Sequence, residues 1–462
     1  MSSQNSKSTT VGVIHSDALS FTAGNDIELD LALVEADCLG TAAHAVMLSR
    51  MPVQPPLLSS RDLRKLLPEL RAIIRDHREG RFRIRLSDQD VHLAVERRLT
   101  KNLGELGKKI HTGRSRNDQV ALDLRLYAKE QILSLLEATG SLSLALVRCA
   151  KKNVTVPMVG RTHMQKAMPS SVALWASAYA EGLLDDLPML LTAYELNDQN
   201  PLGSAAGYGV PLPIDRDLVT RLLGMSRTVH NVLHAGNMRG KLESMVLQSL
   251  GQIMITLSRL SQDLILYSMP EFDYLKLPAE YCTGSSIMPQ KNNPDVLELV
   301  RAKASRILGD GMAVLDIIKG APSGYHRDLQ EIKEPFLRGL ESTQSSVQIM
   351  TSIVSGLRFN KKALTAAFTP DVFATDRALE LVGQGMPFRD AYREVKKDIE
   401  SLSARDPKEA IALKTHVGAT AGLALGDMEF RAREALKFAR EERRSWHRTL
   451  SRLLGAAYPA SI

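Results

Sequence analysis

The sequence predicts an all-α protein built around a bundle of long helices, and three observations support this prediction. Proline, which helix interiors tolerate poorly, is absent from residues 69–156, 214–269 and 295–321. Within these gaps apolar residues recur at helical spacing. Aromatic residues make up only 5% of the chain, which favours an aliphatic core of the kind that helix-on-helix packing produces.

The two longest helical patterns cover residues 118–151 and 237–269. The first has a recurring apolar face made of Val120, Leu124, Tyr127, Leu133, Leu136, Leu142 and Leu146. The second is interrupted only by Gly240 and Gly251, and would span roughly 45–50 Å at 1.5 Å per residue. Helices of this length cannot bury their apolar stripes in a compact single domain, so we expect a bundle that other subunits complete.

The remaining patterns divide the chain into three parts. We expect an N-terminal domain over residues 1–110, a central long-helix domain over 111–357 and a smaller C-terminal helical domain over 358–462. A strand-like alternation occurs in about one place, residues 80–84, and residues 203–213 have the composition of a loop.

Composition excludes several classes of protein. A chain of 462 residues with 44% hydrophobic and 24% charged residues is typical of a globular protein. The net charge of +7 is spread along the chain, which argues against a nucleic-acid-binding protein and suits small anionic substrates. The three cysteines are widely spaced (Cys38, Cys149 and Cys282), which indicates a reducing compartment. Without a secretory signal or an uninterrupted apolar run of membrane-spanning length, the sequence predicts a cytoplasmic protein with no membrane span.

Three polar segments interrupt helical patterns just before a new helix is expected. Residues 111–119 (HTGRSRNDQ) combine two arginines, a serine and an asparagine, which could form a carboxylate or phosphate cradle or simply a capped, solvated turn. Residues 160–169 (GRTHMQKAMP) contain His163, and we expect Pro169 at or near the first position of the next helix. A single histidine there is either structural or catalytic.

The third segment, residues 284–295 (GSSIMPQKNNPD), is the most informative. Asn293, Pro294 and Asp295 have the pattern of the N-cap and first two positions of a helix. A serine pair and a lysine beside a helix N-terminus could bind an anion, or supply a nucleophile or base beside an electrostatic stabiliser.

These three segments together resemble the signature regions of the argininosuccinate lyase family of the fumarase/aspartase superfamily. The likeness extends from about residue 21 to about residue 395. It implies a homotetramer that cleaves argininosuccinate to arginine and fumarate, as in arginine biosynthesis. It also implies that each active site is assembled from segments of three subunits, and that no metal or organic cofactor is needed.

The resemblance assigns roles to individual residues. It implies that Ser285 is the general base, that Lys291 stabilises the aci-carboxylate intermediate, and that His163 pairs with Glu298. Thr162 and His163 would act at the leaving guanidinium, as proton donor or through a water. The residues implied to hold the fumarate-like carboxylates are Ser115, Arg116, Asn117, Ser286 and Asn293. Those implied to contact the arginine-like part are Tyr325, Gln330 and Lys333.

The sequence departs from the family pattern where the amine half of the substrate should be recognised. Gly24 stands where many members have a substrate-binding serine, and residues 231–240 keep only Asn231, Ala235 and Arg239 of a longer family segment. His230 and His234 are four residues apart but lack the further ligands of a metal site, and we expect no metal.

Two alternatives to an argininosuccinate lyase remain at this level. One is another fumarate-releasing carbon–nitrogen lyase that acts on a different N-substituted aspartate. The other is a non-catalytic, crystallin-like tetramer. The presence of Ser285, Lys291 and His163 argues against the second, because a non-catalytic copy would be free to lose them.

Overall fold

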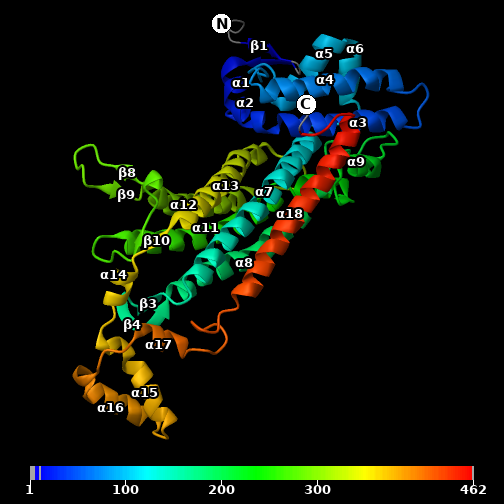
Figure 1. The fold of residues 1–462 in the computed structure, drawn as a ribbon. Coiled ribbons are helices and arrows are strands. Elements are labelled where there is room, and N and C mark those ends of the chain that lie inside the picture. Colours follow the sequence, from blue (N-terminus) through cyan, green and yellow to red (C-terminus); the bar gives the residue numbers. More distant parts are fainter. Residues whose placement is uncertain (1–5, 10–11, 460–462) are drawn as a thin grey trace.

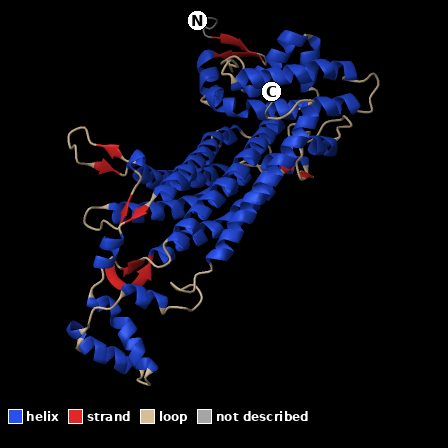
Figure 2. Ribbon diagram, viewed as in Figure 1, coloured by secondary structure: helices blue, strands red, loops and turns tan. Residues whose placement is uncertain are grey.

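The computed structural model describes residues 6–9 and 12–459, and it confirms the predicted all-α fold. A block of N-terminal helices lies at one end of a bundle of long helices, and a group of short helices lies at the other end (Figure 1). Among the described residues the strands are short and lie at the ends of helices or in loops (Figure 2).

The N-terminal block consists of short and medium-length helices preceded by a β-hairpin. Its elements are β1 (Ser6–Thr9), β2 (Gly12–His15), α1 (Ser16–Ala23), α2 (Asp26–Leu29), the 3₁₀ helix η1 (Asp30–Leu33), α3 (Val34–Arg50), α4 (Ser60–Arg78), α5 (Val91–Leu103), α6 (Glu105–Lys108) and η2 (Lys109–His111). Helix α3 packs on α4, α5 and the central helix α7, which fixes this block to the bundle.

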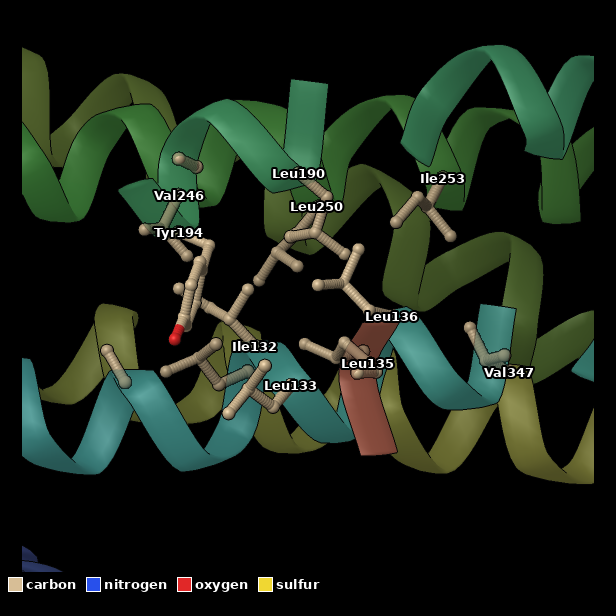
Figure 3. Close-up of a cluster of buried hydrophobic side chains, with 14 of the residues drawn as sticks. Ile132, Leu133, Leu135, Leu136, Leu190, Tyr194, Val246, Leu250, Ile253 and Val347 are labelled. Carbon is tan, nitrogen blue, oxygen red and sulfur yellow. The ribbon is translucent and has the colours of Figure 1, made fainter. Parts of the chain in front are cut away.

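The bundle contains six long helices. They are α7 (Arg116–Lys152), α8 (Val172–Asn197), α11 (Lys241–Ser268), α12 (Asp295–Ile318), α13 (Lys333–Gly356) and α18 (Leu425–Leu454). Helix α7 packs against α8, α13 and α18, and α11 packs against α8, α12 and α13. Buried side chains from α7, α8, α11 and α13 meet in the aliphatic core, where Ile132 and Leu136 lie near Leu190 and Leu250 (Figure 3).

Short elements connect the long helices. Those between α7 and α13 along the chain are β3 (Pro157–Thr162), β4 (Gln165–Ser171), β5 (Gln199–Asn200), α9 (Arg216–Leu223), β6 (Arg227–Thr228), α10 (Val232–Asn237), β7 (Leu275–Lys276), η3 (Ala279–Tyr281), β8 (Thr283–Gly284), β9 (Asn292–Asn293) and η4 (Arg327–Gln330). Those between α13 and α18 are β10 (Arg358–Phe359), α14 (Lys361–Ala366), η5 (Pro370–Phe373), α15 (Ala374–Gly383), α16 (Phe388–Lys397), η6 (Ile399–Ser401) and α17 (Pro407–Ala412).

Local chemistry sets where the longest helices begin. Ser115 caps α7, because its hydroxyl accepts a hydrogen bond from the Asn117 amide at 3.2 Å while Asp118 accepts one from the Ser115 amide at 2.9 Å. Helix α11 begins after Gly240, whose φ is +80° and whose amide donates to Glu243 at 2.7 Å. The helix predicted over residues 237–269 is therefore interrupted at Gly240. Asn237, its first predicted residue, instead ends the separate helix α10.

Three local predictions were wrong. Residues 80–84 form no strand, because the amides of Arg81 and Phe82 donate to the carbonyl of Asp76 and close the end of α4. Pro169 lies in β4 instead of a helix, since Ser171 provides the cap of α8. Asn293 is paired with Thr283 in a β-ladder, so α12 begins one residue later than predicted, with Pro294 at the N-cap position.

Two helical stretches are long and apolar enough to cross a membrane by composition, Asp26–Arg50 and Arg116–Lys152. In the folded chain 83% and 78% of their most apolar windows are buried. Their apolar character is therefore explained by packing inside the protein.

The division of the chain at residues 110 and 357 stays a prediction. Helix α18 belongs to the predicted C-terminal domain by its position in the sequence. In the structure it packs along α7 and α8 and contributes to the bundle.

Candidate active site

The start of α7 lies beneath a loop that Asp118 fixes in place. One carboxylate oxygen of Asp118 accepts hydrogen bonds from the amides of Gly203 and Ala205, at 2.9 and 2.8 Å. This holds the predicted loop around residue 204 over the helix N-terminus, where backbone N–H groups attract anions. The neighbouring Arg116 pairs with Asp90, with 2.9 Å between Nη1 and Oδ2.

A polar cavity opens beside this helix start and contains five of the predicted substrate-binding residues. The predicted residues that line it are Arg116, Asn117, Tyr325, Gln330 and Lys333. The structure thus joins the first polar segment to the connection between α12 and α13, some 200 residues further along the chain.

The cavity also contains charged residues that the sequence analysis missed as site residues. They are Asp26, Asp30, Asp90, Arg239 and Arg327. The ammonium of Lys333 lies 2.9 Å from Asp26 and 2.5 Å from Asp30. Burial alone would lower the pKa of Lys333, but the charges of Asp30 and Asp26 outweigh burial and raise it. The sequence did contain a signal for these residues, because Asp26 and Asp30 are four positions apart on one expected helix face. This spacing alone did not identify Lys333 as their partner.

Thr162 and His163 lie on an exposed hairpin turn, away from the cavity. His163 and Met164 have φ values of +52° and +63°, as the two central residues of a tight hairpin require. The hairpin is held by Arg161, whose guanidinium lies 4.9 Å from the centre of the Phe272 ring and donates to Tyr274. His163 therefore lies at a defined position on the surface.

Ser285 lies on the hairpin of β8 and β9, which projects from the bundle (Figure 1). Its hydroxyl oxygen accepts hydrogen bonds from the amides of Ile287 and Met288, at 3.4 and 3.1 Å. Ser286 and Lys291 are exposed on the same loop, Asn293 is partly exposed in β9, and Glu298 is exposed on the first turns of α12. The loop therefore presents its polar groups to the surroundings of the chain.

One chain does not bring the three predicted segments together. The cavity lies at the N-terminal end of α7 and the Thr162–His163 turn follows its C-terminal end. A helix of 37 residues is about 55 Å long at 1.5 Å per residue. Neither His163 nor Ser285 lines the cavity, and His163 has no contact with Glu298 among the hydrogen bonds and ion pairs of the described residues.

A buried cluster of Asp37, His92 and Asp123 lies next to the cavity, which His92 also lines. The carboxylate oxygens and imidazole nitrogen that could bind a metal ion lie within 4.8 Å of one another. In the described part of the chain this is the one group of three or more such side chains. His92 Nδ1 lies 2.7 Å from Asp37 and 3.5 Å from Asp123. Burial alone would lower the pKa of His92, but the hydrogen bond and charge of Asp37, with Asp90 and Asp123, raise it to about 9. A histidinium hydrogen-bonded to the Asp37 carboxylate accounts for these contacts without a metal ion, and burial together with the charge of Asp37 raises the pKa of the Asp123 carboxyl.

This cluster should make stability depend on pH. The folded-state pKa of His92, about 9, is above its ordinary value of 6.5, so its contribution is fully present below pH 6.5 and is lost as pH rises through 9. The linkage is on the order of 3 kcal/mol. We expect the urea midpoint to fall between pH 6.5 and 9 in the wild type and to fall less in His92→Gln. Parallel pH profiles for the two proteins would contradict this assignment.

The fold is that of the fumarase/aspartase superfamily. Residues 17–309 match the model of a family described as Lyase. A solved structure of an EDDS lyase variant with bound fumarate superposes with a TM-score of 0.76 at 22% identity, covering 95% of this chain and 93% of that one.

Curated relatives define the family more narrowly. The chain is 40% identical to an argininosuccinate lyase of Sorangium cellulosum over 90% of its own length and 96% of the relative's. It is 43% identical to an argininosuccinate lyase of Bacteroides fragilis over 84% of its own length and 86% of the relative's. The chain therefore belongs to the argininosuccinate lyase family of carbon–nitrogen lyases.

Proposed function

We propose that this enzyme cleaves argininosuccinate to L-arginine and fumarate, as a step of arginine biosynthesis in the cytoplasm. The observation that carries the proposal is the identity of 40–43% with argininosuccinate lyases along most of the chain. The polar cavity supports it, because its lining contains both carboxylates and cations and suits a substrate that carries charges of both signs.

Ser285 is the proposed general base. It removes a proton from the succinyl carbon next to a carboxylate, and the electron pair enters that carboxylate to give a dianionic aci-carboxylate. The carbon–nitrogen bond then breaks, its electron pair leaves with the guanidinium nitrogen, which takes up a proton, and fumarate forms. The two amides that donate to Ser285 Oγ support the role, since they would stabilise its deprotonated form. Lys291 would stabilise the dianion.

The other predicted residues complete the proposed site. His163, oriented by Glu298, and Thr162 act at the leaving nitrogen, directly or through a water. The fumarate-like carboxylates are held by Ser115, Arg116, Asn117, Ser286 and Asn293. The arginine-like part occupies the cavity beside Tyr325, Gln330 and Lys333. This chemistry requires no metal or organic cofactor.

A homotetramer would unite these segments from three subunits. Two features support it: the separation of the segments within one chain, and apolar side chains left exposed on the bundle. On α11 and α12, Ile255, Leu299, Leu308 and Met312 are 37%, 59%, 42% and 67% exposed. Neighbouring copies of the bundle would cover such exposed apolar side chains.

The proposal is tested by following fumarate absorbance with argininosuccinate and with other N-substituted aspartates. We expect fumarate release from argininosuccinate at a kcat/KM at least about tenfold above that for any other amine half. Turnover of another N-substituted aspartate without turnover of argininosuccinate would overturn the proposal, and would favour a related lyase with a different substrate.

A further inference from the structure

The carboxylates of the cavity differ in how completely the protein satisfies them. Asp30 accepts from Lys333 through one oxygen and from the Val91 amide, at 3.1 Å, through the other. Asp90 accepts from the Leu93 amide and from Arg116, each at 2.9 Å. Both oxygens of these two aspartates are therefore occupied.

Asp26 is the exception. One of its oxygens lies 2.9 Å from the Lys333 ammonium, and the other has no donor among the described residues. Its side chain is 12% exposed and lines the cavity, whereas that of Asp30 is 1% exposed. Asp26 therefore offers a free acceptor to whatever occupies the cavity.

Asp26 and Asp30 share one cation, the ammonium of Lys333, and the ion pairs of the described residues give neither carboxylate a second cation. The Asp26 carboxylate is partly withdrawn from water, and burial raises the pKa of Asp26 despite the nearby lysine. A cation placed against the free oxygen would compensate the charge of this carboxylate and gain a charge-assisted hydrogen bond.

We propose that Asp26 is a specificity-determining residue that binds a primary ammonium group on the amine half of the substrate. The inference rests on the proposed function, because it takes the cavity as the amine-half site. The ammonium group that Asp26 would select in the cavity is the α-ammonium of the arginine half. Asp26 begins α2, which packs against the start of α13, so the carboxylate is held opposite Lys333 by two elements. Gly24, where the family pattern has a serine, precedes this carboxylate by two residues.

The test compares two ligands that differ only in the ammonium group, L-arginine and 5-guanidinopentanoate. Their Kd values are measured by calorimetry on the whole chain with saturating succinate, a dicarboxylate that lacks the double bond to which the guanidinium nitrogen would add, so the readout does not depend on turnover. In the wild type we expect arginine to bind roughly 10- to 100-fold more tightly, as a charged hydrogen bond provides. In Asp26→Asn the two Kd values should lie within about threefold of each other.

Glu334→Gln is the matched control. It also removes one carboxylate near the start of α13, but Glu334 is bonded to Asn25 and Arg338 and does not line the cavity. We expect it to keep the wild-type preference for arginine. An undiminished preference in Asp26→Asn, or an equal weakening of both ligands, would overturn the inference. Absence of fumarate release from argininosuccinate by the wild type would instead overturn the proposed function.

Discussion

Replacing Ser285 with alanine is expected to lower kcat for argininosuccinate by about 10²- to 10⁴-fold, the usual contribution of a general base. The substitution removes the hydroxyl that accepts from the Ile287 and Met288 amides but leaves the residues that line the cavity unchanged. Substrate affinity should therefore change little, and the fumarate assay together with calorimetric titration separates the two quantities.

Ser286→Ala provides the comparison, because it lies on the same exposed loop and has a proposed role in binding only. We expect it to raise KM more than it lowers kcat. If Ser285→Ala retained at least about a tenth of wild-type kcat, Ser285 would not be the base.

Replacing Lys129 with methionine is expected to destabilise the fold by about 3–5 kcal/mol, as removal of one partner of a buried ion pair does. Lys129 on α7 is fully buried, with its ammonium 2.8 Å from Asp198 and 3.5 Å from Glu442. It also lies over the rings of Tyr194 and Trp446. Methionine preserves the volume but leaves Asp198 without its cation. Urea denaturation of the two proteins measures the loss.

The double variant Lys129→Met/Asp198→Asn separates charge from packing. The double variant also removes the Asp198 carboxylate, which the single variant leaves without a cation. It should therefore recover at least about half of the lost stability. Equal destabilisation in the single and double variants would show that the ammonium stabilises the bundle in another way.

The sequence predicts the long helices well because their signals are local. The apolar face of residues 118–151 leads directly to α7. The proline-free pattern of residues 237–269 leads to α11, which begins after Gly240. The predictions that failed depend on competing hydrogen bonds, such as the closure of α4 by Arg81 and Phe82. The spacing of apolar residues does not show which carbonyl a backbone amide will donate a hydrogen bond to.

The candidate site is predictable only in part for a related reason. Motifs identify Asn117 and Lys333 as members of one site, and both line the cavity. The ion pairs of Lys333 with Asp26 and Asp30 join residues about 300 positions apart in the chain, and no local pattern encodes such a pairing. In the proposed homotetramer the position of Ser285 relative to His163 would depend on other copies of the chain, and no pattern within one sequence encodes that arrangement.

Mixed oligomers test most directly whether one active site is shared between subunits. Ser285→Ala and His163→Asn chains, carrying different affinity tags, are co-expressed, and oligomers with both tags are purified and assayed for fumarate. If the two segments come from different subunits, about a quarter of the sites receive both intact segments, and activity should approach that fraction of wild type although each variant alone is nearly inactive. Activity no greater than that of the separate variants would contradict a shared site.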